Sequence, residues 1–186
     1  MMLDAPALGE FIAARFTHHA FRLETLAAYD VGSDGGDVSR YLRGEPEPDP
    51  ERKGAWLARL RAERAAGKIR QRVHVLRSPL SDYLRYECEW GYVPNVAAGE
   101  DVRILDLAER LLPPSADVGH DFWLLDDEAV VRMNYDPAGR FDSGEVMSSA
   151  EVPRYRAARD AALMAAEPFT AYWQRHLEYH RESRAA

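Results

Sequence analysis

The sequence has a single cysteine, Cys88, so it cannot form a disulfide within the chain, a composition typical of a reducing cytosol. No apolar run approaches the ~20 residues that a membrane helix requires. The first residues, MMLDAPALGEF, lack a basic stretch followed by an apolar one, which predicts no targeting signal. Walker loops, G-x-S-x-G motifs and Cys–His zinc patterns are also missing. We therefore expect a cytoplasmic protein without a cofactor or a metal.

Positive charge is scarce overall but concentrated in one segment. The net charge of −7 argues against nonspecific binding to nucleic acid, which requires a positive field. Nine bases and one acid lie between Arg52 and Arg77, whereas nine acids and two bases lie between Glu100 and Glu128. This asymmetry can orient a protein partner, a second copy in a homodimer or an anionic ligand. The alternative is a solvated helix face beside a solvated loop.

Hydrophobic periodicity and turn residues predict one α/β domain over residues 1–186, close to the border with α+β. We predict helices over Ala7–His18, Val38–Leu42, Pro50–Ala66, Pro79–Gly91, Glu151–Glu167 and Phe169–Arg181, the last two forming a helical C-terminal segment over about 151–182. We predict about five strands, over the start of Ala20–Tyr29 and over Ile69–Leu76, Asp101–Asp106, Phe122–Asp126 and Ala129–Asp136. Asp30–Gly36 is a predicted turn. The order strand, helix, strand around Pro79–Gly91 indicates a parallel pair.

The segment Gly119–Asp136 contains the outline of a phosphodiesterase site. His120 and Asp127 have the spacing of the first and last residues of the H-x-K-x-x-x-x-D motif of phospholipase D-like enzymes, and Asn134 lies where those enzymes place a downstream polar residue. Phe122 occupies the lysine position and cannot neutralise the charge that develops at phosphorus. No second motif is present. An ordinary β-hairpin is therefore favoured over catalysis by these three residues.

A second candidate site lies where a predicted strand gives way to a helix. Ligands of open α/β sheets bind beyond the carboxyl ends of strands, and a helix N-terminus offers free N–H groups to an anion. Ser78 is a suitable N-cap before Pro79, and Arg77 adds a guanidinium. We predict an anion pocket formed by Arg72, His74, Arg77 and Ser78. The alternative is a plain N-cap beside an exposed arginine.

Aromatic residues form a stripe on the predicted helix that follows. Tyr83, Tyr86 and Trp90 lie on one face of Pro79–Gly91. Such a stripe is typical of core packing, and it becomes a stacking platform for nucleobases only if it is exposed.

Four segments resemble, in this order, an actinobacterial domain of unknown function: AFRLETLAAYDV, YLRGEPEPDP, GKIRQRVHVLRSPLSDYLRYECEWGYVPNVAAGEDVRILD and DFWLLDDEAVVRMNYDPAGRF. The resemblance covers roughly Phe16 to Tyr172. Members of that family are commonly encoded beside XRE-type helix-turn-helix regulators, so the resemblance implies a cytoplasmic accessory to a regulator. It implies no catalytic residues. The family is also similar, more loosely, to phospholipase D-like sensor domains, which implies a mixed sheet with helices packed on it.

The leading hypothesis is a noncatalytic regulatory or ligand-sensing domain that acts through a protein partner, with a helix-turn-helix regulator as the expected partner. An anionic small ligand fits this hypothesis, and direct binding to nucleic acid does not. The rival hypothesis is an enzyme that uses His120 and Asp127, a phospholipase D-like phosphodiesterase or nuclease, with a toxin as one form of it.

Overall fold

The structure is a computed structural model that describes residues 1–30 and 36–181. Its strands are β1 (Met2–Leu3), β2 (His19–Glu24), β3 (Ile69–Leu76), β4 (Asp101–Asp106), β5 (Phe122–Leu125), β6 (Ala129–Tyr135), β7 (Phe141–Val146) and β8 (Glu167–Pro168). They form one mixed sheet in the order β1-β7-β6-β5-β2-β3-β4-β8. Strands β2, β3 and β4 are parallel at its centre, and the remaining neighbours pair antiparallel.

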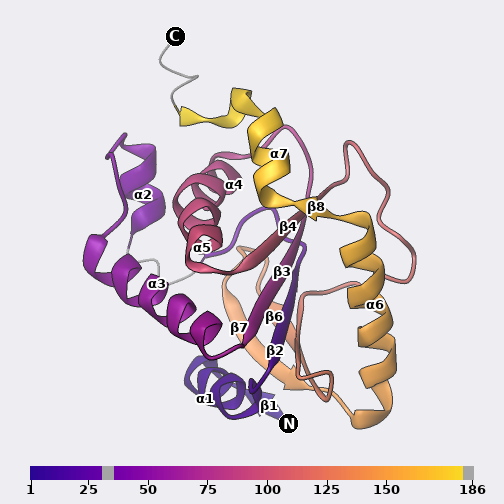
Figure 1. Ribbon diagram of the computed structural model, residues 1–186. Coiled ribbons are helices and arrows are strands. Elements are labelled where there is room, and N and C mark those ends of the chain that lie inside the picture. The colour runs from indigo at the N-terminus through magenta and orange to yellow at the C-terminus, as the bar shows by residue number, and fades with distance from the viewer. Residues whose placement is uncertain (31–35, 182–186) are drawn as a thin grey trace.

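The helices surround this sheet (Figure 1). They are α1 (Ala5–Arg15), α2 (Asp37–Leu42), α3 (Pro50–Ala65), α4 (Asp82–Tyr86), the π-helix η2 (Glu87–Tyr92), α5 (Val93–Ala98), α6 (Val152–Ala165) and α7 (Phe169–Arg175), with single 3-10 turns at Ser149–Glu151 and Leu177–Tyr179. Local sequence explains where several begin. Asp49 caps α3 by accepting a hydrogen bond from the Arg52 N–H at 2.9 Å, and Pro50 follows at the first helical position.

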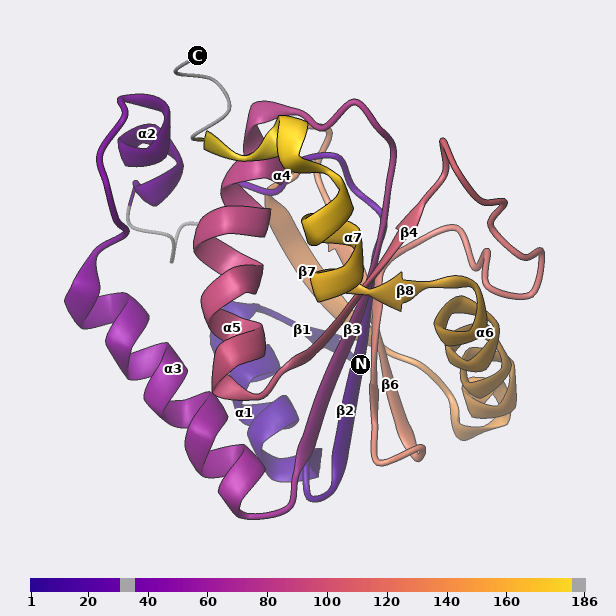
Figure 2. The same ribbon diagram turned by 45° about the horizontal axis from the view of Figure 1, so that its top comes forward.

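The two faces of the sheet have different coverings. Viewed edge-on, α1, α3 and the α4–α5 segment lie on one side of the sheet and α6 lies on the other (Figure 2). Phe21, Leu23 and Val73 pack toward Tyr155 and Ala158 of α6 in the largest apolar cluster. Because side chains alternate along a strand, their neighbours on β2 and β3 point to the opposite face. Those neighbours include arginine, glutamate and histidine, so the opposite face has a polar centre.

Most of the predicted architecture is confirmed. The structure is α/β with a helical C-terminal region, β3 and β4 have the predicted bounds and pair parallel, and β5 and β6 form the predicted hairpin. The sheet has eight strands rather than about five. Strands β1 and β8 contain two residues each, and no strand was predicted where β7 lies.

The predicted start of the helix after β3 is wrong. Ser81, not Ser78, is the N-cap of α4, and its side chain accepts a hydrogen bond from the Leu84 N–H. Ser78 is used differently, because its N–H and hydroxyl both bond to the Asp106 carboxylate. The helical segment also continues past Gly91 to Ala98 as η2 and α5.

Two predicted segments extend beyond the described residues. Residues 31–35 of the predicted turn and residue 182 of the predicted C-terminal segment lie outside the described residues. Within the residues that are described, no helix has both the length and the apolar character needed to cross a bilayer.

Candidate functional site

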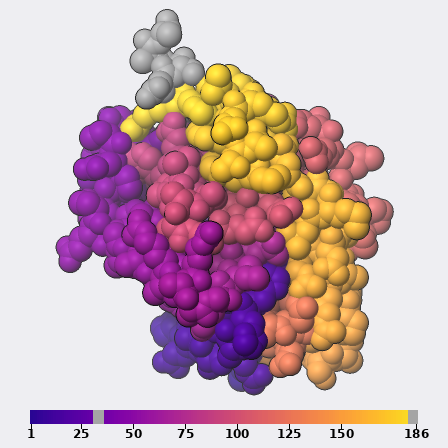
Figure 3. Space-filling view, in the orientation of Figure 1, coloured from indigo at the N-terminus to yellow at the C-terminus, as the bar shows by residue number. Residues whose placement is uncertain are grey.

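A cavity of about 480 Å³ lies between the sheet and the helices on its polar face, and we call it the charged cavity. Its floor is formed by Arg22 and Glu24 of β2 and by Arg70 and Arg72 of β3. Residues of α1, α3, the α4–α5 segment and the loop at Tyr29 form its walls. Figure 3 shows α3 beside the α4–α5 segment over this face of the sheet.

The lining of the charged cavity combines charged and aromatic side chains. Six bases line it: Arg22, Arg52, Lys53, Arg59, Arg70 and Arg72. Three acids line it: Glu24, Asp37 and Glu87. Six aromatic residues complete the set: Tyr29, Trp56, Tyr83, Tyr86, Trp90 and Trp123. Glu63 and Glu100 do not line the cavity but pair with Arg59, Arg70 and Arg72, so the bases exceed the nearby acids by one. This excess favours an anion, and the aromatic faces favour a planar ring.

A buried ion cluster forms the floor. Nη1 of Arg72 donates to Glu24 at 2.8 Å, while Nε and Nη2 of Arg72 donate to Glu100 at 3.1 and 3.0 Å. Nη2 of Arg22 lies 2.9 Å from the other oxygen of Glu24. The Glu100 carboxylate also accepts from the side chain of Asn95 at 2.8 Å. The guanidiniums of Arg22 and Arg72 thus share the Glu24 carboxylate. The Glu100 carboxylate balances the second positive charge.

These contacts keep the cluster ionised. Burial alone would raise the pKa of Glu24, but the Arg22 and Arg72 guanidiniums outweigh it and lower that pKa to about 2. Burial alone would lower the pKa of Arg72, and the carboxylates of Glu100 and Glu24 reverse this and raise it. The floor therefore holds fixed charges at neutral pH, in a region that water hardly reaches.

His74 lies beneath this floor and is fully buried. Its Nε2 is 3.1 Å from the Leu26 carbonyl, which can only accept, so the neutral ring donates there and accepts at Nδ1. Burial lowers the pKa of His74, which favours that neutral form. The hydroxyl of Tyr92 has one proton and two acceptors in reach, Nδ1 of His74 at 2.7 Å and Glu24 at 3.2 Å. His74 therefore fixes the position of Tyr92 against the ion cluster.

One donor in the charged cavity is unsatisfied. The Nε atom of Arg22 is buried and has no hydrogen-bond partner among the described residues. The same guanidinium lies over the rings of Trp123 and Tyr29, with centroid distances of 5.3 and 5.9 Å. Buried donors are rarely left without an acceptor, and here the two ring faces give the guanidinium a partial substitute for one.

The π-helix η2 shapes one wall of the charged cavity. Glu87, Trp90 and Gly91 of this segment line it. A Cβ atom on Gly91 would lie 3.0 Å from a carboxylate oxygen of Glu87, so glycine lets that carboxylate lie across the backbone. Single π-turns within helices are frequent at functional sites because they displace side chains from the regular helical spacing.

The structure separates the four residues of the predicted anion pocket. Arg72 lines the charged cavity and His74 lies under it, but Arg77 lines a different pocket. Ser78 is held by Asp106, with the Ser78 N–H 3.0 Å from the carboxylate. Alternation along β3 explains this division, because Arg72 and His74 point to one face and the strand has ended at Arg77.

The residues of the phosphodiesterase outline are also apart. His120 precedes β5 and Asp127 lies in the turn after it, so the four residues of β5, a span of roughly 13 Å, lie between them. Nε2 of His120 is 2.8 Å from the Tyr155 hydroxyl, and Asp127 forms an ion pair with Arg159. Asn134 lies on β6, where its side chain donates to the Ser143 hydroxyl at 3.3 Å. The structure does not bring His120 and Asp127 together.

The predicted aromatic stripe packs in the core, the role that is typical of such a stripe, and it also reaches a cavity. Tyr86 and Trp90 are buried in a small cluster with Tyr41, and they also line the charged cavity together with Tyr83. Residues 1–30 and 36–181 contain no group of three or more His, Cys, Asp or Glu that could hold a metal.

Sequence reasoning missed Arg22, Glu24 and Glu100. The sequence contained a pattern that could have identified Arg22 and Glu24. Two charged residues lie two positions apart on each of two strands, Arg22 and Glu24 on β2 and Arg70 and Arg72 on β3. Charges at this spacing within a buried strand must share one face and need partners.

The sequence model of one protein family matches residues 7–174, and that family is described as a domain of unknown function (DUF6879). The matched region contains every residue that lines the charged cavity. No curated protein matches the chain.

Proposed function

The chain belongs to the family of the domain of unknown function DUF6879, and we propose that it is a ligand-sensing domain whose charged cavity binds a planar aromatic anion. One observation carries this proposal. The charged cavity is lined by six aromatic residues and by twice as many bases as acids, over a floor of fixed charges. In this proposal the domain acts without catalysis, through a protein partner.

The chemistry of the ligand follows from the lining. Aromatic faces of Trp56, Trp90 and Trp123 stack on planar rings, and such stacking tolerates different rings. The bases of α3 and β3 attract a phosphate or a carboxylate. The volume of about 480 Å³ lies within the range of ordinary small-molecule pockets. Nucleotides combine both features and are the test class.

The helix α3 provides a route from ligand to partner. Its inner side brings Trp56 and Arg59 to the charged cavity, while Arg61 and Arg64 are exposed outside that cavity, with Arg64 packed beside Gly99. A ligand that contacts α3 can therefore change how the outer bases meet an acidic surface on the partner. The partner that the family resemblance implies is a helix-turn-helix regulator. A phospholipase D-like ancestry and a homodimer stay predictions.

Tryptophan fluorescence can test ligand binding directly. Three of the four tryptophans line the charged cavity, and the fourth, Trp173, packs in another cluster. We expect purine mononucleotides to quench this fluorescence and to release heat in calorimetry. Adenosine and inorganic phosphate, as the two halves of the ligand, should bind more weakly than the whole nucleotide. A folded protein that shows neither quenching nor heat with any nucleotide would refute the proposal.

A matched pair of variants on α3 locates the binding. Arg59→Met removes a base that lines the charged cavity, whereas Arg61→Met removes an exposed base two residues away. We expect Arg59→Met to weaken nucleotide binding by about tenfold, the value of one charge-assisted contact, and Arg61→Met to leave it unchanged. Equal affinities for the two variants would place the ligand elsewhere.

The partner is tested separately. A tagged chain, incubated with native cytoplasm at physiological salt, should retain a helix-turn-helix protein in stoichiometric amount. The variant Arg61→Glu should lose it, because this change reverses an exposed charge of α3 outside the charged cavity. An eluate that contains only the tagged chain would contradict this part of the proposal and leave the ligand part standing.

A further inference from the structure

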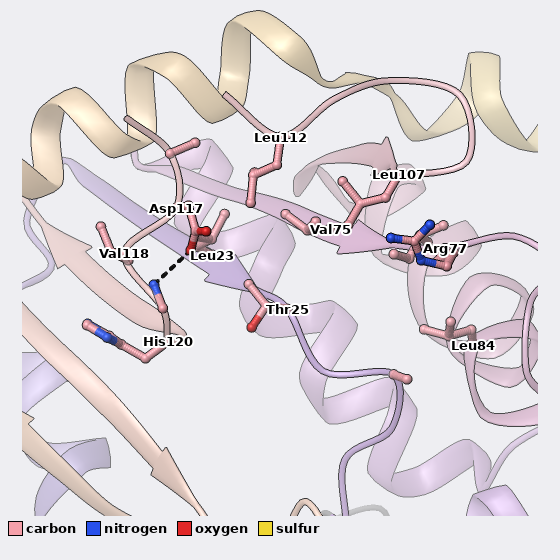
Figure 4. A pocket seen from close by; sticks show the side chains of 14 residues that line it. Leu23, Thr25, Val75, Arg77, Leu84, Leu107, Leu112, Asp117, Val118 and His120 are labelled. Atoms are coloured by element: carbon pink, nitrogen blue, oxygen red, sulfur yellow. Dashed lines mark hydrogen bonds between the residues drawn. The ribbon is translucent and has the colours of Figure 1, made fainter. Parts of the chain in front are cut away.

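A second pocket, of about 500 Å³, lies at the carboxyl ends of the parallel strands β2 and β3, and we call it the strand-end pocket. It is enclosed by the loop that follows β4, from Leu107 to His120 (Figure 4). In α/β sheets, ligands bind beyond the carboxyl ends of parallel strands, where the connecting loops diverge. The strand-end pocket is at that position, and it does not share a lining residue with the charged cavity.

Its walls are apolar, unlike those of the charged cavity. Leu23 and Val75 of the central strands face Leu107, Leu112 and Val118 of the enclosing loop. Of its lining residues, only three have ionisable side chains: Arg77, Asp117 and His120. A ligand that fills this volume must therefore have a mainly apolar body.

Arg77 stands at one end of the strand-end pocket with its guanidinium unpaired (Figure 4). It has no hydrogen bond or ion pair to any other residue in the described part of the chain. The backbone on both sides of it is nevertheless fixed. The Leu76 carbonyl accepts from the Leu107 N–H at 2.8 Å, and the Ser78 N–H donates to Asp106 at 3.0 Å. A free guanidinium on a fixed backbone is suited to hold a carboxylate.

The opposite end of the strand-end pocket disfavours an anion. Asp117 and His120 lie there, away from Arg77 (Figure 4). A carboxylate oxygen of Asp117 accepts from the Gly119 N–H at 3.1 Å and carries a negative charge. Burial, together with the nearby Arg132 and Arg154, lowers the pKa of His120, so its ring is neutral at pH 7. This difference between the ends gives a bound anion one orientation.

We propose that the strand-end pocket binds an elongated apolar small molecule with one carboxylate, held by Arg77, and with its apolar tail among the leucines and valines. This second site differs from the charged cavity in ligand class, and the inference does not depend on the proposed function. The two sites would let one domain respond to two chemically distinct molecules.

The test uses three probes that share one tail: octanoate, octanol and octylamine, each titrated into the full chain by calorimetry. We expect octanoate to bind more tightly than octanol, and octylamine to bind most weakly, because only octanoate has a carboxylate that can pair with the Arg77 guanidinium. Arg77→Met should weaken the binding of octanoate at least tenfold and leave the affinity for octanol unchanged. The matched control is Arg43→Met, which removes another exposed arginine outside both pockets and should change neither affinity.

Three results would overturn the assignment. They are equal affinity of the wild-type chain for octanoate and octanol, unchanged octanoate binding in Arg77→Met, and no binding of any probe. Leu112→Gln tests the site of the apolar tail. Leu112 is half-buried in the loop, and this change should weaken the binding of octanoate and of octanol alike. A saturating nucleotide should not displace octanoate. Failure of the octanoate series and failure of the nucleotide series are therefore separate outcomes.

Discussion

Glu24→Gln is the most informative single change in the floor of the charged cavity. The substitution keeps the size of the side chain and removes its charge, while Arg22 and Arg72 keep theirs. Both guanidiniums lie within 2.9 Å of Glu24 in the folded chain. We expect the variant to fold with a lower free energy of unfolding, because two buried cations then share fewer carboxylates.

The size of the effect follows from the pKa of Glu24. It falls from 4.5 to about 2 on folding, and each pKa unit corresponds to about 1.4 kcal/mol. The ionised carboxylate therefore contributes about 3 kcal/mol at pH 7. Removing one partner from a buried ion pair costs about 3–5 kcal/mol in other proteins, which agrees.

The dependence on pH has a definite sign. Because the folded pKa of Glu24 lies below the unfolded one, its contribution is complete above pH 4.5 and is lost as the pH falls through about 2. The difference between wild type and Glu24→Gln should therefore be constant from pH 6 to 8. It should shrink by about 1.4 kcal/mol at pH 3.5, because Glu24 of the unfolded wild-type chain, with its pKa of 4.5, then binds a proton while the folded carboxylate does not.

Urea unfolding, followed by circular dichroism at several pH values, measures this difference. The control is Glu128→Gln, an exposed carboxylate in the β5–β6 turn, which should change stability by less than about 0.5 kcal/mol. A loss below about 1 kcal/mol for Glu24→Gln at pH 7, or a difference that does not shrink in acid, would refute the reasoning.

Three further changes test other parts of the fold by urea unfolding at pH 7. Tyr92→Phe should destabilise the chain by about 1–3 kcal/mol, because Nδ1 of the buried His74 loses its donor at 2.7 Å; no loss would mean that water replaces the hydroxyl. Ala158→Leu should cost about 1–3 kcal/mol by overpacking α6 against the sheet, whereas Met164→Leu, 85% exposed on the same helix, should be neutral; equal effects would contradict the packing shown for α6. Asp126→Asn should cost about 1–2 kcal/mol, because the carboxylate accepts from the backbone N–H groups of Thr17, His18 and His19. Burial alone would raise the pKa of Asp126, but those hydrogen bonds lower it below the ordinary value for aspartate. The stability lost in Asp126→Asn should therefore fade only at a pH below that ordinary value, and a loss already absent at pH 5 would argue against this cause.

Local signals predicted the regular elements well. β3 and β4 have the predicted bounds because apolar residues alternate with polar ones along most of each strand, and a glycine, Gly67 or Gly99, lies two residues before each strand begins. The start of α3 was also predictable, because Asp49 and Pro50 act through neighbouring backbone. β7 was not, because its sequence FDSGEV favours a turn. Pairing with β6 on one side and β1 on the other makes it a strand, and these partners are not local.

The candidate sites depend on contacts between distant segments, which explains what the sequence could not provide. Ser78 has the properties of an N-cap, but the Asp106 carboxylate, 28 residues later, competes for its N–H and hydroxyl. Arg72 was predicted to hold an anion together with His74, Arg77 and Ser78. Its partners, Glu24 and Glu100, are 48 and 28 residues away and become visible only when β2, β3 and β4 are placed side by side.

The two short strands at the ends of the sheet limit how this domain can associate. β1 and β8 have two residues each, and Pro168 of β8 has no N–H to offer. Sheets with long open edges recruit strands from other chains and grow into fibres, whereas short edges and edge prolines block this growth. Within the described residues, neither side of the sheet offers a long ladder of free backbone groups. A binding partner must therefore recognise side chains on the helices rather than extend the sheet, and crowded chains have little backbone template on which to aggregate.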